Sequence, residues 1–521
     1  MLTVKQYEMA ELSFCGPVPG KNEAQVDFGA VFTQENSSIK VNGFYAGEGV
    51  YKVRYFPERA GICNYEIWGL TEDKGQIEIL PHGKESRGII RAVGTHFEDE
   101  TGKLFHPFGT TVYAMIHQDR ELIQKTYQTL EKTKFNKIRI CIFPKHFIYN
   151  ECEPALFPFE KDENEWETQR PCFLFWDALD EHIVRLGKMG IEVDLILFHP
   201  YDKWGFARML QEKNLIYLDY AIRRLAAYPN IWWSLANEYE VSGAKSLEDW
   251  HEIENFVAEH DPWKHLLSCH NIGNLYEPSR KNITHISAQT KLFTRVDTWR
   301  KRYRKPVIID ECLYEGNLKE LWGSISGREL TRRFWRTVLS GGYCTHGETF
   351  YDLEDIIWWS KGGILKGESP ERIGFCKGII ESLPGHIHRE CGTEDKMLEL
   401  VGKSAEEIDA IARNYKNKNA VEAEGESHIL RSFASLGEEA ILLAAEDYDY
   451  KGHIADKCFL HYHNFRTPAI DEFDLPKDRQ YRIRVIDTWE MTDTVVEENA
   501  SGKIVVALPG REDILVLAEQ I

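Results

Sequence analysis

The stretch NIWWSLANEYE, residues 230–240, decides the fold. Residues 231–235 form an apolar, β-branched and aromatic run of the kind that makes a short buried strand. The run opens into the polar pair Asn237-Glu238. A buried parallel strand that ends in a carboxylate indicates a (β/α)8 barrel, because the active sites of this fold gather at the C-terminal ends of its strands.

A second stretch, KPVIIDECLY at residues 305–314, repeats this pattern and ends its apolar run at Asp310-Glu311. Between residues 104 and 346, apolar runs alternate with segments of helical periodicity, which predicts a parallel sheet. Eight runs fit a closed barrel. An open, doubly wound sheet is the alternative, but no glycine-rich phosphate loop follows any run. The predicted strands are 104–113, 136–143, 191–198, 230–236, 265–269, 283–287, 306–310 and 342–346.

An all-β region precedes the barrel. Residues 1–86 alternate apolar and polar side chains at period two between glycine, proline and asparagine turns, which predicts a small β-sandwich. The barrel is assigned to residues 87–392, and it opens with a hairpin expected around residues 100–103.

A connector and a second β-region follow the barrel. Residues 393–419 are predicted to be a helical connector, in which Ser404 and Glu407 form a capping box that opens a helix. Residues 420–521 alternate again, beginning with HILRSF (428–433) and AILLAAE (440–446), and are predicted to form a C-terminal β-sandwich.

Composition excludes several classes of function. A chain of 521 residues is too long for a single hydrophobic core, so several domains are expected. Its content of 43% hydrophobic and 12% aromatic residues is typical of a globular protein. A net charge of −20 argues against a nucleic-acid partner, since phosphates require a basic face. The sequence has no run of 18 apolar residues, so no membrane span is predicted. No signal-peptide pattern is present and the 11 cysteines form no framework, so we expect a cytoplasmic protein with reduced thiols. The sequence does not determine the oligomeric state, and a homo-oligomer is possible.

The two strand-ending glutamates suit glycosidic hydrolysis. That reaction needs one carboxylic acid to protonate the leaving oxygen and one carboxylate to attack or to activate water. Strands four and seven lie across the mouth of a barrel, so Glu238 and Glu311 are expected to approach each other. Their pKa values must differ, and Arg139, at the end of strand two, is placed to keep one of them ionised. Asp310 is the alternative nucleophile, although strand alternation should turn it away from the mouth.

This arrangement resembles the large superfamily of retaining glycoside hydrolases with (β/α)8 barrels. In that superfamily the acid/base follows an asparagine after strand four, and the nucleophile follows strand seven. The matching residues are Asn237-Glu238 in SLANEYE, Glu311 in VIIDECLYEG, Arg139 in KIRICIF and His199 in LILFHPYD. The resemblance implies that Glu238 is the acid/base and Glu311 the nucleophile, that Asn237 binds the 2-hydroxyl of the sugar, and that Arg139 keeps Glu311 ionised.

Further substrate-binding residues are implied in the same way. His199 and His270 are expected to line the pocket. The superfamily often has a Tyr or His after strand six that touches the nucleophile, but ITHISAQT offers only Gln289. Of Trp358 and Trp359, in the loop after strand eight, one is expected to stack on a sugar and the other to pack inward.

The whole chain resembles bacterial glycosidases, mostly uncharacterised, with an N-terminal β-sandwich, a barrel and a C-terminal β-domain. The stretches GVYKVRYFPERAG, HPFGTTVYAM, WWSKGGILKGESPERI and VIDTWEMT carry this resemblance. The expected function is a cofactor-free, retaining β-glycosidase that acts on plant-derived oligosaccharides.

Two other functions remain open. One is a non-catalytic carbohydrate-binding barrel, against which the intact Asn237-Glu238 and Glu311 argue. The other is a metal-dependent hydrolase, which would need an HxH motif at the end of strand one, where PFGTTVYAM has none. The pairs at 386/388 and 461/463 lack nearby further ligands, so they are interpreted as solvent-facing histidines and no metal is predicted.

Overall fold

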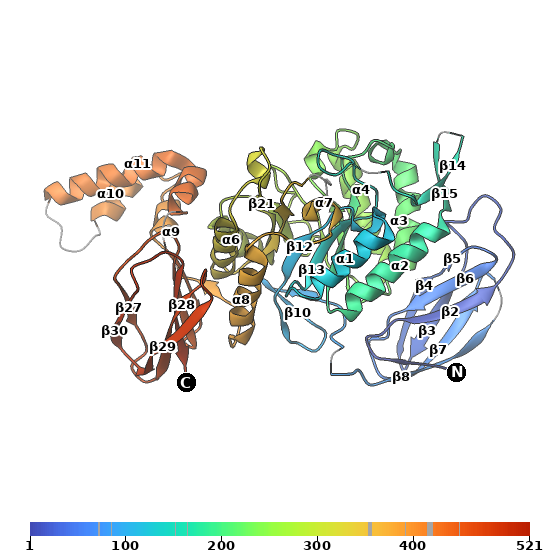
Figure 1. The fold of residues 1–521 in the computed structure, drawn as a ribbon, viewed down its shortest axis with the longest axis horizontal. Coiled ribbons are helices and arrows are strands. Elements are labelled where there is room, and N and C mark those ends of the chain that lie inside the picture. The colour runs from blue at the N-terminus through green and yellow to red at the C-terminus, as the bar shows by residue number, and fades with distance from the viewer. Residues whose placement is uncertain are drawn as a thin grey trace. The chain divides into compact units, whose positions relative to one another are not determined.

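The computed structural model describes residues 1–70, 73–84, 86–151, 153–163, 165–352, 357–390, 392–413, 420–446 and 449–521. The chain forms two compact units, and we describe each by itself (Figure 1). The first contains residues 1–289, 303–330 and 343–377, and the second contains residues 290–302, 331–342 and 378–521. Among the described helices, none combines the length and apolar character that a membrane crossing requires. None of the nine cysteines in the described segments forms a disulfide bond.

Two sheets face each other in the N-terminal region, as the alternating pattern predicts. Phe32 of the larger sheet stacks on Tyr55 of the smaller one with ring centroids 4.3 Å apart. The larger sheet has the order β1-β8-β7-β3-β4 and the smaller one β2-β6-β5. Their strands are β1 (Leu2–Lys5), β2 (Ala10–Cys15), β3 (Gly29–Gln34), β4 (Ser37–Asn42), β5 (Phe44–Tyr45), β6 (Val50–Tyr55), β7 (Gly61–Trp68) and β8 (Lys74–Leu80).

A small antiparallel sheet leads into the barrel. It contains β9 (Arg91–Val93), β10 (His96–Glu98) and β11 (Leu104–Phe105). The predicted hairpin is confirmed, because Phe97 of β10 pairs with Phe105 of β11. Both rings pack in one buried cluster with Trp232, Ile308 and Tyr343, which lie in the first halves of barrel strands. The hairpin therefore covers the end of the barrel at which the strands begin.

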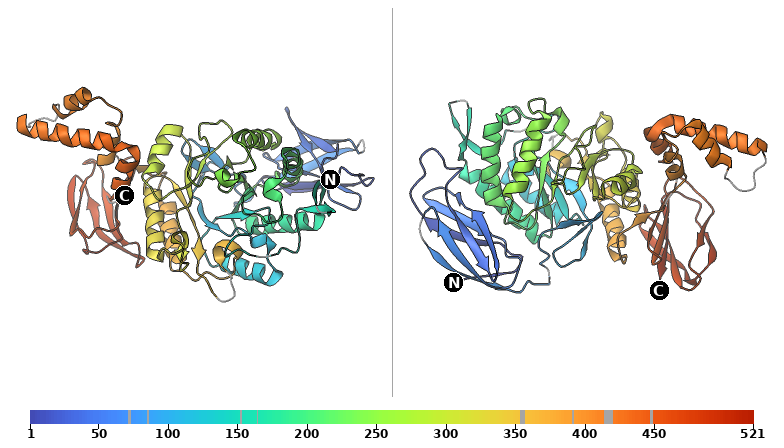
Figure 2. Two further views of the ribbon diagram at one scale, coloured as in Figure 1. Left: turned by 90° about the horizontal axis from the view of Figure 1, so that it is seen from above. Right: turned by 180° about the vertical axis from the view of Figure 1, so that it is seen from behind.

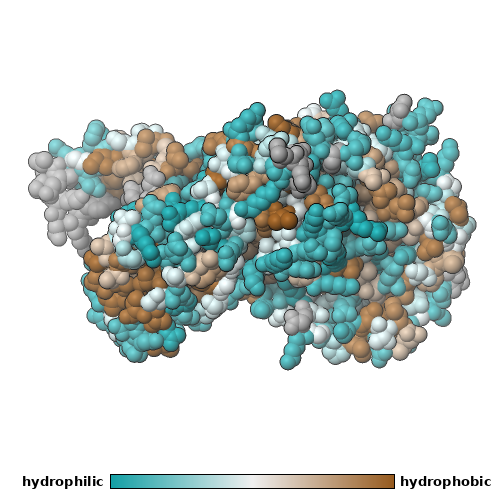
Figure 3. Space-filling model, viewed as in Figure 1, coloured by the Kyte–Doolittle hydropathy of each residue, from teal (hydrophilic) through white to brown (hydrophobic). Residues whose placement is uncertain are grey.

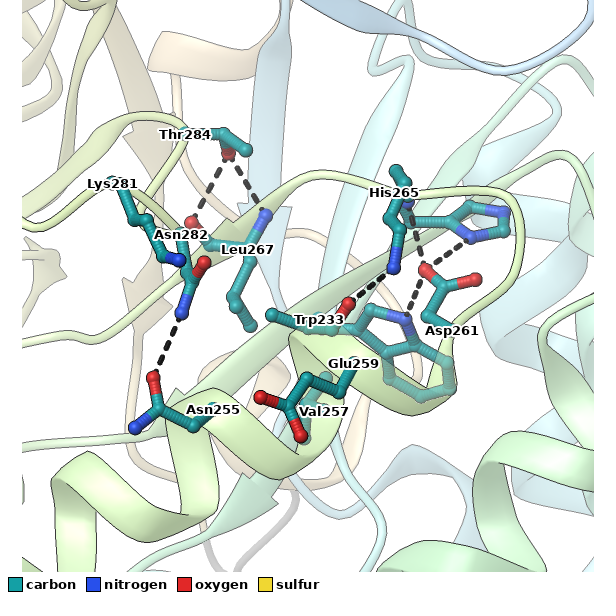
Figure 4. A pocket seen from close by; sticks show the side chains of 12 residues that line it. Trp233, Asn255, Val257, Glu259, Asp261, His265, Leu267, Lys281, Asn282 and Thr284 are labelled. Carbon is teal, nitrogen blue, oxygen red and sulfur yellow. Dashed lines mark hydrogen bonds and ion pairs between the residues drawn. The ribbon is translucent and has the colours of Figure 1, made fainter.

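Eight parallel strands form the barrel, in the order β18-β17-β16-β13-β12-β22-β20-β19. The two outer members are joined around Leu267 and Thr284 (Figure 4). There the Leu267 N–H donates to Thr284 Oγ1 (2.8 Å) and the Thr284 hydroxyl donates to the Leu267 carbonyl (3.1 Å). The sheet closes on itself through these bonds, which confirms the (β/α)8 barrel against the open sheet. The strands are β12 (Phe108–Thr111), β13 (Lys137–Cys141), β16 (Glu192–Phe198), β17 (Ile231–Ala236), β18 (Leu267–Ser268), β19 (Ile286–Gln289), β20 (Val307–Glu311) and β22 (Tyr343–His346).

Helices alternate with these strands along the chain, and the green helices of the first unit lie outside the strands (Figure 2). Apolar residues at helical spacing face inward on α2 (Phe173–Lys188) and α3 (Gln211–Leu225). The other helices are α1 (Arg120–Leu130), α4 (Leu247–His260), α5 (Arg295–Tyr303), α6 (Gly327–Leu339), α7 (Trp358–Lys361), α8 (Ser369–Ser382) and the short η1 (Met115–His117), η2 (Phe206–Arg208), η3 (Tyr239–Val241) and η4 (Leu321–Gly323). Short strands in the loops are β14 (Phe159–Asp162), β15 (Glu165–Pro171), β21 (Glu315–Gly316) and β23 (Glu348–Thr349).

A buried ion cluster joins the N-terminal sheets to the barrel. Arg54 of β6 donates two hydrogen bonds to Asp180 of α2, at 2.9 and 2.7 Å. The same guanidinium donates to the carbonyl of Arg224 (2.6 Å), whose own side chain donates to Asp180 (2.7 Å). All three residues are buried. Removal of Arg54 would leave the buried Asp180 with one guanidinium partner instead of two, so the cost of burying its charge would be less fully offset.

The substitution Arg54→Ala is therefore expected to lower the free energy of unfolding by about 3–5 kcal/mol. Chemical denaturation of the full chain measures the change. Lys52→Ala on the same strand is the control, since the ion pair of Lys52 with Glu11 (2.8 Å) is partly open to solvent. That control should cost at most about 1 kcal/mol. Equal losses in the two variants would contradict a special role for the buried cluster.

After residue 392, the described part of the second unit contains three helices. They are α9 (Thr393–Leu398), α10 (Ala405–Arg413) and α11 (Ala420–Ala445). The capping box before α10 is confirmed, because the Ser404 N–H donates to Glu407 Oε2 (2.7 Å) and the Glu407 N–H donates to Ser404 Oγ (3.3 Å). Residues 414–419, the end of the predicted connector, lie outside the described residues.

The strands predicted at 428–433 and 440–446 are wrong, because α11 occupies both segments. Ile441, Leu442 and Ala445 are buried at positions i, i+1 and i+4, which lie on one face of a helix. Apolar runs of only six or seven residues fit a strand and a helix equally well, so the pattern could not separate them. The sheets of this unit therefore begin at residue 450 rather than at 420, apart from the short strand β24 (His388–Arg389).

Two sheets complete the unit, one of six strands in the order β24-β25-β26-β31-β28-β29 and one formed by β27 and β30. Apolar side chains gather over β27 and β30 on the face shown in Figure 3. The strands are β25 (Tyr450–Ile454), β26 (Cys458–His463), β27 (Ile470–Asp474), β28 (Tyr481–Asp487), β29 (Thr492–Ala500), β30 (Lys503–Ala507) and β31 (Ile514–Gln520).

Candidate active site

Glu238 follows strand β17 at the C-terminal end of the barrel. Its backbone is left-handed (φ 50°, ψ 59°), a conformation that is rare outside glycine and that turns the chain sharply out of the strand. The side chain is only 6% exposed. The Tyr201 hydroxyl donates to Glu238 Oε2, and the Glu238 N–H lies 3.4 Å from His270 Nδ1. Tyr201, after one neighbouring strand, therefore holds the carboxyl group, and His270, after the other, holds the backbone of Glu238.

Glu311 is the last residue of β20, and strands one and two supply its partners. Tyr113, just after β12, donates its hydroxyl hydrogen to Glu311 Oε1. Arg139 of β13 lies 3.6 Å from the same oxygen through Nη1. The register between β19 and β20 shifts here, so that Ala288 pairs with Ile309 but Gln289 pairs with Glu311. This bulge lets Glu311 reach the mouth of the barrel.

One tyrosine hydroxyl links the two glutamate motifs. The oxygen of Tyr113 that donates to Glu311 also lies 3.0 Å from Asn237 Oδ1. Arg139 Nη2 donates to this amide oxygen as well, at 3.1 Å. Because Asn237 directly precedes Glu238, the two carboxyl groups lie at one mouth, far apart in sequence and adjacent in space.

The two carboxyl groups have different pKa values. Burial and then the charge of Glu311 raise the pKa of Glu238 to about 7. Burial acts to raise the pKa of Glu311 too, but His270, Arg139 and the Tyr113 hydroxyl together lower it. Burial brings the pKa of His270 itself to about 4, so at neutral pH Arg139 and Tyr113 keep Glu311 ionised. A protonated carboxyl beside an ionised one is the arrangement that glycosidic hydrolysis requires.

Three residues that the sequence analysis did not single out complete the mouth. Tyr113 and Tyr201 follow strands one and three, and their positions after those strands were the signal available in the sequence. Lys145 follows strand two and is buried, with Nζ 3.5 Å from the ring centroid of Tyr113. The same atom lies 4.6 Å from the ring of Tyr201 and 4.7 Å from that of Trp359.

The predicted pocket residues on strands three, five and six are all near the barrel mouth. His199 is buried, with Nε2 3.1 Å from the carbonyl of Phe143, and burial lowers its pKa to about 3. His270 is fully buried beside Glu238. Gln289 is paired with Glu311 in the strand register, and the tyrosine that contacts Glu311 is Tyr113 after strand one, whereas the superfamily often has such a residue after strand six.

The two tryptophans after strand eight are both buried but have different neighbours. Trp358 is buried in the barrel core, and its Nε1 donates to Thr110 Oγ1 (2.8 Å). Trp359 packs edge-on against Tyr113, with ring centroids 5.5 Å apart, and also contacts the ring of Tyr314. Of the two, Trp359 therefore lies beside the carboxyl groups.

A layer of ion pairs lies beneath the carboxyl groups. Asp310 accepts hydrogen bonds from Lys137 Nζ (2.8 Å), Thr345 Oγ1 (2.7 Å) and Ser287 Oγ (2.6 Å). Lys137 also pairs with Asp194 at 2.7 Å, and these charged residues are at most 1% exposed. Both oxygens of Asp310, the alternative nucleophile, are therefore occupied within the barrel interior.

A second acidic cluster follows strands seven and eight. Glu315, His346 and Glu348 are buried, and one potential ligand atom of each lies within 4.8 Å of the others. Glu348 accepts the backbone N–H groups of residues 366 and 367, and Glu315 accepts those of residues 368 and 369. Each of the four carboxylate oxygens thus accepts an N–H, so the cluster is explained as the anchor of the loop before α8.

The interpretation of the 461/463 pair as solvent-facing is wrong. His461 and His463 are 5% and 3% exposed, and β27 lies against them: the ring of His461 stacks on that of Phe473 with centroids 4.0 Å apart, and His463 Nε2 lies 3.3 Å from Asp471. His461 Nδ1 lies 2.9 Å from Asp471, and His463 Nδ1 lies 3.0 Å from Asp449. Both histidines are explained as buried partners of aspartates.

Comparison with solved structures defines the class of protein. A crystal structure from Bacteroides vulgatus, described as a candidate glycoside hydrolase, matches at 30% identity and a TM-score of 0.84, with 100% of each chain covered. A family 5 glycoside hydrolase from the same organism matches at 14% identity and a TM-score of 0.57, covering 84% of this chain and 93% of that one. No curated protein matches. The predicted resemblance is confirmed: the chain is a glycoside hydrolase on a (β/α)8 barrel.

Its family follows from the barrel itself. Residues 92–369, more than half of the chain, match the model of the apiosidase-like catalytic domain. The chain therefore belongs to the apiosidase-like family. Residues 3–68 and 447–516 match two domains of unknown function, DUF5060 and DUF5605, which correspond to the N-terminal and C-terminal sheet regions.

Proposed function

We propose that the protein is a retaining glycosidase that cleaves β-glycosidic bonds in plant-derived oligosaccharides by double displacement. The observation that supports this most directly is the pair of buried glutamates with opposed pKa shifts, linked through Tyr113 and Asn237. Glu238 is the acid/base and Glu311 the nucleophile.

In the first step, Glu311 attacks the anomeric carbon while Glu238 gives its proton to the leaving oxygen. The bond to the leaving group breaks, and an ester joins the sugar to Glu311. The hydrogen bond from Tyr113 and the charge of Arg139 hold Glu311 ionised until it attacks. Asn237, whose amide oxygen these two residues contact, would donate its amide N–H to the 2-hydroxyl.

In the second step, Glu238 has lost its proton and acts as a base. It takes a proton from water, the water oxygen attacks the anomeric carbon, and the ester bond to Glu311 breaks. The charge of Glu311 is absent while the ester exists. Because that charge is one of the causes that raise the pKa of Glu238, the pKa falls at the stage where a base is needed.

The sugar that is cleaved stays a prediction at the level of class. The description of the family as apiosidase-like brings apiosides into the panel of substrates to test. Aryl β-glycosides of hexoses, pentoses, apiose and uronic acids cover the chemistry that an oligosaccharide end can present. The cytoplasmic location also stays a prediction.

Covalent labelling tests the proposal. An activated 2-deoxy-2-fluoro β-glycoside of an accepted sugar is expected to inactivate the protein with a 1:1 burst of aryl alcohol. Peptide mass spectrometry should then find the sugar on Glu311. Glu320→Gln, a partly exposed glutamate that accepts a hydrogen bond from Tyr149, should label normally. Hydrolysis with inversion and without a labelled intermediate would refute the retaining mechanism.

A further inference from the structure

Lys145 is a buried lysine that interacts electrostatically with both carboxyl groups. Its side chain is 2% exposed, and its ammonium lies against the faces of Tyr113, Tyr201 and Trp359. The hydroxyl of one tyrosine touches Glu311, and that of the other touches Glu238. The ammonium therefore lies beside the space in which a sugar bonded to both catalytic groups would sit.

The ammonium has no acceptor of its own in the described part of the chain. Neither a hydrogen bond nor an ion pair within 4.0 Å joins Nζ to a described residue, although the charges of Glu311 and Glu238 act on it. The ring faces attract the cation only weakly and accept none of its hydrogens in a conventional hydrogen bond, whereas an ammonium has three N–H donors to satisfy. Buried donors without acceptors are costly, so such groups usually have a bound partner.

We propose that Lys145 is a specificity-determining residue that donates hydrogen bonds to an oxygen substituent of the glycone, the sugar held between Glu238 and Glu311. The inference rests on the proposed function and goes beyond it by naming the residue that selects the sugar. A sugar hydroxyl and the carboxylate of a uronic acid share the required acceptor chemistry. Trp359 supplies an apolar wall on the same side of the glycone.

The test combines a substitution in the enzyme with removal of single hydroxyl groups from the substrate, and measures whether the two effects are coupled. Wild-type protein and Lys145→Met are assayed with aryl β-glycosides of hexoses, pentoses and uronic acids, and with monodeoxy forms of the best substrate. We expect Lys145→Met to lower kcat/KM on that substrate roughly 10- to 100-fold, as for loss of a charged hydrogen bond. Removal of one particular hydroxyl should cost the wild type a similar factor and cost the variant nothing further.

Two outcomes separate the sources of the oxygen. A wild-type preference for a uronide over the corresponding neutral hexoside, lost in Lys145→Met, assigns the contact to a carboxylate. Coupling to one hydroxyl without such a preference assigns it to that hydroxyl. A uniform loss across the panel would overturn the inference, because a lysine that merely supports Tyr113 would weaken every substrate alike.

Controls keep this test separate from the proposed function. Lys161→Met removes another lysine stacked on an aromatic ring, at 4.3 Å from that of Trp166 and exposed on β14, and should leave all rates unchanged. If Lys145→Met does not fold, Lys145→Gln carries the same cycle. A wild type that is labelled at Glu311, with unchanged kinetics in the Lys145 variants, would refute the inference alone. A wild type that no fluoro-sugar labels and no glycoside engages would remove both proposals.

Discussion

Replacement of Glu311 by alanine is expected to lower kcat/KM on activated aryl β-glycosides by on the order of 10⁵-fold or more, the scale seen when a covalent nucleophile is removed. Tyr113 and Arg139 hold the Glu311 carboxylate, and the other group that both of them contact, the amide of Asn237, is no nucleophile, so it cannot take over the attack. Asp310 is one residue away, but both of its oxygens are occupied in the layer below.

A rescue experiment makes this prediction specific. Azide added to Glu311→Ala should restore turnover and give the α-glycosyl azide, because the anion enters from the face that the carboxylate has left. Glu320→Ala serves as the matched control and should keep wild-type rates. Wild-type rates in Glu311→Ala would exclude Glu311 as the nucleophile, and rescue that gives the β-azide would reverse the roles of the two glutamates.

Replacement of Glu238 by alanine is expected to depend on the leaving group. General acid catalysis contributes about 10²- to 10⁴-fold, and this loss should be largest for substrates with poor leaving groups. Bond cleavage of a dinitrophenyl glycoside needs little protonation and should be nearly preserved. Added azide should give the β-glycosyl azide here. The matched control is Glu240→Gln, two residues along the chain, whose carboxylate accepts N–H groups of residues 272–274.

The pH profile gives an independent measurement of the same group. Glu238 must be protonated to act as the acid, and its pKa is raised to about 7. The kcat/KM of the wild type should therefore be high below pH 7 and fall tenfold per unit above it. In Glu238→Ala this alkaline fall should disappear. A wild-type rate that stays level up to pH 9 would contradict the assignment.

The barrel could be predicted from the sequence because its strands carry local signals. Residues 231–236 and 307–311 are apolar runs that end abruptly in polar pairs, and buried parallel strands have this composition. The C-terminal region was predicted less well. In α11, short apolar runs lie on either side of Gly437. Only the tertiary packing of Ile441 and Leu442 shows that these runs follow the helical period rather than the period of two residues of a strand.

The site was predictable where position along a strand determines chemistry. Glu238, Glu311 and Arg139 end their strands or lie near the ends, so the topology alone brings them together. Tyr113, Tyr201 and Lys145 act through contacts made by loops, and no spacing in the sequence specifies those. The shifted register between β19 and β20 was equally invisible, since a single-residue bulge leaves no periodic signature.

The ionic layer under the mouth limits how this enzyme could be stabilised. Exchanging buried charges for well-packed aliphatic side chains often strengthens a protein. Here Lys137, Asp194 and Asp310 surround the guanidinium of Arg139, with its Nε 3.8 Å from each aspartate. Aliphatic side chains at these positions would disturb the Arg139 guanidinium, which keeps the Glu311 carboxylate ionised. Stabilising substitutions should therefore be sought in the N-terminal and C-terminal sheets and in the outer helices, where they would leave the catalytic groups unchanged.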